Sequence, residues 1–331
     1  IRLFMSKILV TTVPFSDKNT LPLEIIKNNN IEYLINPLNK KLTEDELVDM
    51  VSDFDVIVAG TEPITKKVMD AATNLKMISR VGIGLDSVDL LEAEKRNIIV
   101  SYTPDAPAPA VAELTIGLML SLLRSVQISN VEMHNGRWKR FLGKRLSEST
   151  IGIIGAGRIG SGVLRHLQGF KSPKILLNDI NQNSSLNEKY NIQWADKETI
   201  YEQADIITIH TPLTKKTKNM ITKSQLLGMK EDALVINTAR GGIINEQDLY
   251  DVMQAGHLGG AAIDVFDFEP YDGKLREIER CILTAHMGSM SIDCRIRMEI
   301  EATEEAVRFL TNQSLKSQVP EEEYAVQRRG L

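Results

Sequence analysis

The chain has 331 residues, of which 43% are hydrophobic and 25% are charged, and its formal net charge is −5 at pH 7. This composition is typical of a globular protein long enough for two domains. No lysine–arginine cluster is dense enough for nucleic-acid binding, and the longest apolar stretch, Leu114–Leu123, is too short to cross a bilayer. The start of the chain has no signal-peptide pattern. We therefore expect a cytoplasmic protein with neither a nucleic-acid nor a membrane partner.

The two cysteines indicate a reduced protein without a metal site. Cys281 and Cys294 have neither C-x-x-C spacing nor neighbouring histidine pairs. A disulfide between them is the less favoured alternative. Met5-Ser6-Lys7 resembles a natural start, which leaves open whether Ile1–Phe4 is native.

The first hundred residues alternate short apolar runs with helix-like segments. Strands are expected over 7–12, 31–35, 54–60, 76–81 and 98–102, with helices over 21–29, 43–51, 64–72 and 88–95. Thr43 and Glu46 have the spacing of a capping box at the start of the second helix. The alternation is typical of a parallel sheet with helices on both faces.

The composition then changes around a proline-rich segment. Thr103–Pro109 holds three prolines, which fix backbone angles and predict a crossing between two domains. The helix expected next, from about Ala110 to Val126, is apolar nearly all round. Such a helix must be buried between elements, domains or subunits.

A glycine-rich segment opens the second domain. The apolar run from Ile151 ends in Gly155, and Gly157 and Gly160 complete a G-x-G-x-x-G spacing before a helix expected over Arg158–Phe170. This order of strand, glycine turn and helix is the one that a dinucleotide site requires. The N-terminus of the helix offers N–H groups and a partial positive charge to a pyrophosphate. The alternative is a glycine-rich turn that binds nothing.

An acidic residue follows at the position expected for ribose recognition. Asp179 ends the next apolar run, 19 residues after Gly160. Its carboxylate would accept hydrogen bonds from the ribose hydroxyls and repel a 2′-phosphate. The sequence therefore predicts NAD rather than NADP as the cofactor.

The rest of the chain continues the same alternation. Further strands are expected over 150–154, 174–178, 192–194, 205–210, 233–238, 260–265 and 281–285. A long amphipathic helix over about 291–310 is expected to return to the first domain, and the charged tail 321–331 is expected to be loose. We expect a discontinuous substrate-binding domain over 5–103 and 290–318, a nucleotide-binding domain over 104–289, and a tail over 319–331.

Two histidines occupy positions suited to catalysis. Hydride transfer to a carbonyl also moves a proton, and histidine titrates near neutral pH. His210 and His286 each end an apolar strand, where parallel sheets bind their ligands. Both remain candidates on position alone, and Gly288 and Ser289 favour His286 because they let the backbone approach a ligand. His166 and His257 are better explained as structural, and His134 is not assigned.

Two charged residues follow neighbouring strands. Arg240 comes directly after a buried strand with glycines behind it, a setting typical of an arginine that holds a carboxylate. Glu269 follows the next strand, with Pro270 fixing its loop. The alternative is a plain salt bridge between the two.

Taken together, these motifs resemble the D-isomer-specific 2-hydroxyacid dehydrogenase family. The resemblance runs from Lys7 to about Asn312 and is strongest to phosphoglycerate-dehydrogenase-type members that lack a C-terminal regulatory domain. The segments that carry it are Gly155–Gly160 with Asp179, His210–Thr214, Asn237–Gly241, Asp264–Pro270 and His286–Ser289.

The resemblance implies the architecture, the roles and the partner. It implies an α/β protein of two doubly wound parallel-sheet domains, a Rossmann NAD-binding domain and a flavodoxin-like substrate domain, with a cleft between them. Arg240 would polarise the substrate carbonyl and hold its carboxylate, His286 would transfer the proton, and Glu269 would hydrogen-bond His286. A homodimer through the helix region 110–126 is also implied.

The resemblance also assigns binding residues. The loop of Val81, Gly82, Ile83 and Gly84 would bind the substrate carboxylate through backbone N–H groups, together with Arg240 and His286. The residues expected to line NAD are Gly155, Gly157, Arg158, Ile159, Gly160, Asp179, His210, Thr211, Pro212, Thr238, Ala239, Asp264, Gly288 and Ser289.

The substrate stays open at this stage. The segment 60–65 has no arginine for a phosphate, and Glu62 would repel one. The candidates are 3-phosphoglycerate and a hydroxypyruvate- or glyoxylate-type acid. The alternative to an enzyme is an NAD(H)-sensing, corepressor-like binding protein of the same fold.

Overall fold

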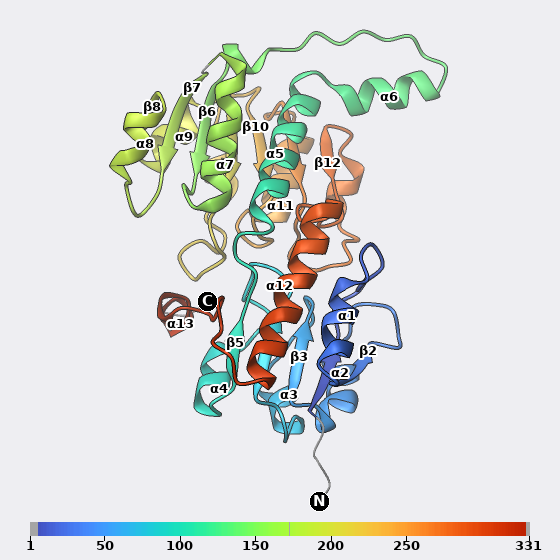
Figure 1. The fold of residues 1–331 in the computed structure, drawn as a ribbon. Coiled ribbons are helices and arrows are strands. Elements are labelled where there is room, and N and C mark those ends of the chain that lie inside the picture. The colour runs from blue at the N-terminus through green and yellow to red at the C-terminus, as the bar shows by residue number, and fades with distance from the viewer. Residues whose placement is uncertain (1–5, 172, 329–331) are drawn as a thin grey trace, which may run out of the picture. The chain divides into compact units, whose positions relative to one another are not determined.

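The computed structural model describes residues 6–171 and 173–328, so residues 1–5, 172 and 329–331, including the open question of Ile1–Phe4, lie outside the described part. The chain divides into two compact units (Figure 1). Unit 1 comprises Ile1–Pro107 and Met290–Leu331, and unit 2 comprises Ala108–Ser289. The boundaries expected from the sequence were 103/104 and 289/290.

Unit 1 is built around a parallel sheet of five strands in the order β2-β1-β3-β4-β5. The strands are β1 (Lys7–Val10), β2 (Glu32–Ile35), β3 (Val56–Ala59), β4 (Met77–Arg80) and β5 (Ile99–Ser101). This is the flavodoxin-like order, as expected. All four residues of β3 and of β4 are buried, because helices cover both faces of the sheet.

The helices of unit 1 come from both ends of the chain. They are α1 (Leu21–Asn28), α2 (Glu44–Met50), α3 (Lys66–Ala71), α4 (Leu90–Lys95), α12 (Ile292–Leu310) and α13 (Glu321–Arg328), with a short 3-10 turn η1 (Val51–Asp53). Thr43 and Glu46 form the expected capping box of α2. The helix α12 packs on α1, β3 and β4, and Ser79 Oγ of β4 donates a 2.7 Å hydrogen bond to Ala302 O.

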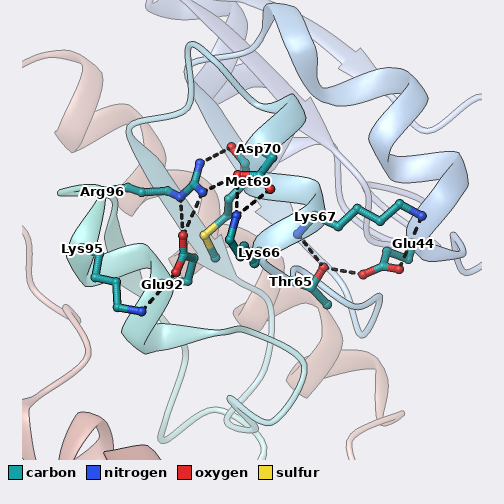
Figure 2. A network of polar contacts seen from close by, with 9 residues as sticks. All are labelled: Glu44, Thr65, Lys66, Lys67, Met69, Asp70, Glu92, Lys95 and Arg96. Carbon is teal, nitrogen blue, oxygen red and sulfur yellow. Dashed lines mark hydrogen bonds and ion pairs between the residues drawn. The ribbon is translucent and has the colours of Figure 1, made fainter.

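A polar network ties α3 to α4 on the surface of unit 1 (Figure 2). The guanidinium of Arg96 donates to Glu92 Oε1 at 2.9 Å, to Asp70 Oδ1 at 2.5 Å and to Met69 O at 2.9 Å. These contacts follow the C-terminus of α4, where a cation also interacts favourably with the helix dipole. The network therefore fixes α4 against its neighbour.

Unit 2 contains a parallel sheet of seven strands in the order β12-β11-β10-β9-β6-β7-β8. The strands are β6 (Thr150–Ile154), β7 (Lys174–Asn178), β8 (Ile192–Trp194), β9 (Ile206–Ile209), β10 (Leu234–Asn237), β11 (Gly260–Ile263) and β12 (Cys281–Leu283). When the strands are numbered from β6, this is the Rossmann order 3-2-1-4-5-6 with β12 added next to β11. Every strand that the sequence predicts in either unit is present, usually one or two residues shorter.

The helices of unit 2 cover both faces of this sheet. They are α5 (Ala108–Leu123), α6 (Val126–His134), α7 (Arg158–Leu167), α8 (Ser184–Lys189), α9 (Lys197–Gln203), α10 (Lys223–Leu227) and α11 (Glu246–Gln254), with 3-10 turns η2 (Leu146–Glu148), η3 (Gln168–Phe170) and η4 (Lys274–Glu277). The helix α5 lies along α7 (Figure 1).

The apolar helix is present with shifted bounds, and the prediction of a loose tail was wrong. The helix expected over 110–126 begins at Ala108, with Pro109 in its first turn, and ends at Leu123. Ser125 then adopts a left-handed conformation with φ of 48°, and α6 starts in a new direction 63° away. The end of the chain, expected to be loose, forms α13 through Arg328.

No single helix in the described part of the chain is long and apolar enough to span a membrane. Only the bent pair of α5 and α6 reaches the required length together.

Candidate active site

The glycine turn between β6 and α7 has the close backbone contacts of a dinucleotide site. Gly155 has φ of 103°, and a Cβ there would lie 2.6 Å from the carbonyl oxygen of His210. A Cβ on Gly160 would lie 1.9 Å from the carbonyl oxygen of Gly155. By contrast, a Cβ on Gly157 would meet nothing within 4 Å. Gly155 and Gly160 are therefore required by the fold, whereas Gly157 leaves open space for a ligand.

The start of α7 completes this phosphate site. Gly157 is the N-cap of α7 and has no side chain with which to cap it. A helix of ten residues with a glycine N-cap presents its first N–H groups and the positive end of its dipole to an anion. Arg158 and Ile159 form the first turn of this helix. The residues present thus fit the pyrophosphate of NAD.

Asp179 lies beside the glycine turn. Its Oδ2 accepts a 2.6 Å hydrogen bond from the N–H of Ala156 in the glycine turn, and its Oδ1 accepts from Asn181 at 2.8 Å. The acidic residue after β7 is therefore held against the glycine turn. This is the arrangement that the spacing predicts.

His210 directly follows β9, and its ring contacts the side chain of Thr208 two residues earlier. Its ring lies inside unit 2, where Nε2 is 3.0 Å from Thr208 Oγ1, and burial lowers the pKa of His210 to about 3. It is therefore neutral at physiological pH and cannot donate a proton there. Its backbone supports Gly155 at the switch point between β6 and β9, and Thr211 and Pro212 follow it along the same edge.

His286 and Glu269 form a hydrogen-bonded pair. The carboxylate of Glu269 accepts from Nδ1 of His286 at 2.9 and 3.1 Å. Both side chains are partly exposed, 38% for His286 and 28% for Glu269. Because both contacts use Nδ1, Nε2 is the nitrogen that faces away from Glu269 and can exchange a proton with a ligand.

The turn that carries His286 is held by a buried carboxylate. His286 has φ of 52°, an uncommon conformation for a residue with a side chain. Asp264, 1% exposed, accepts hydrogen bonds from Met287 N at 2.7 Å and Gly288 N at 2.8 Å, and from Thr284 Oγ1 at 2.5 Å. Burial raises the pKa of Asp264, and these three donors oppose that rise. Asp264 thus fixes the backbone on either side of the histidine.

Arg240 lies on the neighbouring turn. Asn237 braces this turn, since its amide donates to Arg240 O at 2.8 Å and accepts from Ala239 N at 3.0 Å. A Cβ on Gly241 would lie 2.1 Å from the backbone of Phe266, whose N–H donates to Glu269 Oε1. The absence of a side chain at Gly241 therefore lets the Arg240 turn pack directly on the Glu269 loop.

Sheet order explains why these residues lie on neighbouring loops. β10, β11 and β12 are adjacent and parallel, with Asn237 in register with Ile263 and Ile263 with Leu283. Arg240, Glu269 and His286 follow these three strands. They therefore lie on loops at the carboxyl ends of the strands. The predicted residues Thr238, Ala239, Gly288 and Ser289 lie on the same loops. Thr238 Oγ1 also contacts Thr115 Oγ1 of α5 at 2.9 Å.

The predicted carboxylate loop, Val81–Gly84, belongs to unit 1 and directly follows β4. The motif 80–86, which contributes to the family resemblance, begins with Arg80, but the sequence assigns this residue no role; it is only 6% exposed. A Cβ on Gly82 would lie 2.8 Å from Nη1 of Arg80, so the guanidinium packs directly against the loop. The sequence signal for Arg80 is its position as the charged last residue of the buried strand β4.

Comparison with known proteins identifies the family. The model of the D-isomer specific 2-hydroxyacid dehydrogenase NAD-binding domain matches residues 116–288. The chain belongs to the D-isomer specific 2-hydroxyacid dehydrogenase family. It is 33% identical over 279 residues to hydroxypyruvate reductase of Thermotoga maritima, which covers 82% of this chain and 90% of that protein.

Further family members differ in length. D-3-phosphoglycerate dehydrogenase of Methanocaldococcus jannaschii is 38% identical over 75% of this chain but 48% of its own length. The crystal structure of the TT0316 protein of Thermus thermophilus superposes with a TM-score of 0.85 at 30% identity, covering 95% of this chain and all of that one. As a member of this family, the chain is an NAD-dependent oxidoreductase that acts on 2-hydroxy acids.

The glycine turn generates a matched pair of variants. Gly160→Ala places a methyl group against the carbonyl oxygen of Gly155. We therefore expect the free energy of unfolding to fall by about 1–3 kcal/mol. Gly157→Ala meets no protein atom, so its stability should stay within about 0.5 kcal/mol of wild type while NADH binding weakens. Urea unfolding and NADH fluorescence titration measure both. Equal destabilisation by the two variants would contradict this assignment.

Proposed function

We propose that this protein reduces a small, unphosphorylated 2-oxo acid to the D-2-hydroxy acid, with Arg240, Glu269 and His286 as its catalytic residues. The observation that carries the proposal is the His286 ring held through Nδ1 by Glu269 on the edge of the Rossmann sheet. Bound NADH supplies the hydride.

In this proposal His286 transfers the proton. During reduction, Nε2 of the protonated ring donates its proton to the oxygen of the carbonyl group, which becomes the hydroxyl group. Glu269 orients the ring and stabilises its positive charge through Nδ1. In the oxidative direction, the neutral ring accepts the hydroxyl proton through the same nitrogen.

Arg240 holds and polarises the substrate. Its guanidinium is a planar set of donors that suits the carboxylate and carbonyl oxygens of a 2-oxo acid. The Asn237 brace and the tight packing of Gly241 fix the turn from which it projects. A fixed donor stabilises charge that develops on the carbonyl oxygen without rearranging during the reaction.

The loop Val81–Gly84 is the proposed site for the substrate carboxylate. Gly82 has φ of 143°, a conformation open to glycine and strained for other residues. The buried guanidinium of Arg80 packs against this glycine. Backbone N–H groups of a glycine-rich turn are suited to an anion.

Glu62 supports an unphosphorylated substrate. It lies on the loop after β3, the strand next to β4, and is only 1% exposed. Its carboxylate accepts hydrogen bonds from Gly60 N at 2.9 Å and from the Thr11 hydroxyl. This buried carboxylate would repel the phosphate group of a phosphorylated 2-oxo acid, since like charges in a protein interior interact strongly.

The two free thiols support a cytoplasmic location. Cys281 and Cys294 are both buried, and burial raises the pKa of Cys281 to about 12 and that of Cys294 to about 11. Such thiols stay protonated and are suited to a reducing compartment.

A panel of substrates tests the proposed function. With NADH, we expect turnover of glyoxylate or hydroxypyruvate, and at least about a hundredfold lower kcat/KM for phosphohydroxypyruvate because of Glu62. NADPH should be at least about tenfold poorer than NADH, because Asp179 repels a 2′-phosphate. Preference for the phosphorylated acid would contradict the substrate assignment. NADH binding without reduction of any 2-oxo acid would favour the corepressor-like alternative.

An exposed apolar segment supports a homodimer. Along α6 and the loop that arches from it back to β6 (Figure 1), several large apolar side chains are exposed. They are Val126, Val131, Met133, Trp138 and Leu142, with exposed fractions from 46% to full exposure. We refer to residues 126–142 as the arm. A second copy of the chain is the partner we propose for it, which moves the expected interface from α5 to the following segment.

Sedimentation tests the dimer. We expect twice the chain mass of 37.0 kDa for the wild type and a shift toward monomer for Trp138→Asp, which places a charge in the interface. Ile180→Asp is the matched control, because Ile180 is 97% exposed outside the arm. A monomeric wild type, or an equal effect of the two variants, would contradict this interface.

A further inference from the structure

The segment that follows the carboxylate loop is held by the C-terminal helix. Gln327 in α13 donates through Nε2 to Val88 O at 2.8 Å and to Leu85 O at 3.4 Å. Its Oε1 accepts from Leu90 N at 2.9 Å. One amide thus satisfies three backbone groups between the loop and α4, all of them within unit 1.

These contacts meet groups that need partners. Leu90 is the first residue of α4, so its N–H has no acceptor within the helix. Asp89 caps the same helix by accepting from Glu92 N at 2.9 Å. Gln327 therefore acts as a second cap, supplied from a residue 237 positions away.

The carboxylate loop is anchored at both of its ends. At its start, Gly82 N donates to Thr103 Oγ1 at 2.8 Å, and Thr103 N donates to Gly82 O at 3.1 Å. At its end, Leu85 O accepts from Gln327. Between the anchors lie Ile83 and Gly84, both partly exposed. A stretch with two glycines loses much conformational freedom on ordering, so its geometry depends on these anchors.

The C-terminal segment is itself fixed to the edge of the sheet. Tyr102 N donates to Ser317 O at 3.1 Å, and Val319 N donates to Val100 O at 2.9 Å, so residues 317–319 cover the edge strand β5. Tyr324 is buried in the hydrophobic core of unit 1. The helix α13 is thus attached to unit 1 in two ways. The segment before it pairs with β5, and Tyr324 within it packs in the core.

We propose that Gln327 is a positioning residue for the carboxylate loop and that residues 317–327 act as a strap that sets the affinity for the 2-oxo acid. This inference rests on the proposed role of Val81–Gly84. The strap orders the loop before the substrate arrives, which lowers the entropy that substrate binding must otherwise remove. Its loss should weaken substrate binding and leave cofactor binding intact, since the hydrogen bonds of Gln327 within the described part of the chain go to Leu85, Val88 and Leu90 of unit 1.

The test compares three variants of the full-length protein. Gln327→Met keeps the length of the side chain and removes the three hydrogen bonds, and Gln327→Ala removes the side chain. Arg328→Ala is the matched control on the same helix, because it removes only exposed ion pairs with Glu94 and Glu321. The readouts are KM for the 2-oxo acid, kcat, the Kd of NADH, and amide hydrogen exchange of residues 82–90.

Both Gln327 variants should raise KM by about threefold to tenfold, with kcat and the Kd of NADH within about twofold of wild type. Exchange at residues 82–90 should be faster in both, and Arg328→Ala should match wild type in every readout. Unchanged KM and exchange in Gln327→Met would overturn the inference while leaving the proposed function intact. Because exchange is measured without turnover, an inactive wild type would refute the proposed function alone.

Discussion

The hydrogen bond between Glu269 and His286 is the interaction on which the proposed chemistry depends. It occupies Nδ1 of the ring at 2.9 Å and so decides which nitrogen is left for a substrate. A histidine without a carboxylate partner would lack both the orientation and the support for its positive charge. His210, which follows β9, contacts Thr208 Oγ1 instead, and desolvation lowers the pKa of His210 to about 3.

Close backbone contacts join the three loops that carry the proposed catalytic residues. Gly241 lies against Phe266, and Asp264 bonds to Met287 and Gly288, so each loop supports the next one along the sheet edge. Asp264 was expected among residues lining NAD. Its three hydrogen bonds show that it holds the turn with the positive φ of His286. The site is therefore built from backbone contacts as much as from side chains.

Much of this could be predicted from the sequence, because strand periodicity and glycine spacing are local signals. All twelve strands, the glycine turn with Asp179, and the pairing of Glu269 with His286 agree with the expectation. The break at Ser125 could not be predicted, since one left-handed residue does not interrupt the apolar pattern. The helix α13 was missed because its acidic start looks like a solvated tail, and only tertiary contacts such as that of Tyr324 order it.

The most direct test of the central claim is the turnover of His286→Asn, with His257→Asn as a control, because His257 contacts Met229 O away from the site. The account predicts that His286→Asn lowers kcat/KM for the 2-oxo acid by at least about a hundredfold, with the Kd of NADH within about twofold of wild type. His257→Asn should keep its activity. Turnover of His286→Asn within a few-fold of wild type would contradict the account.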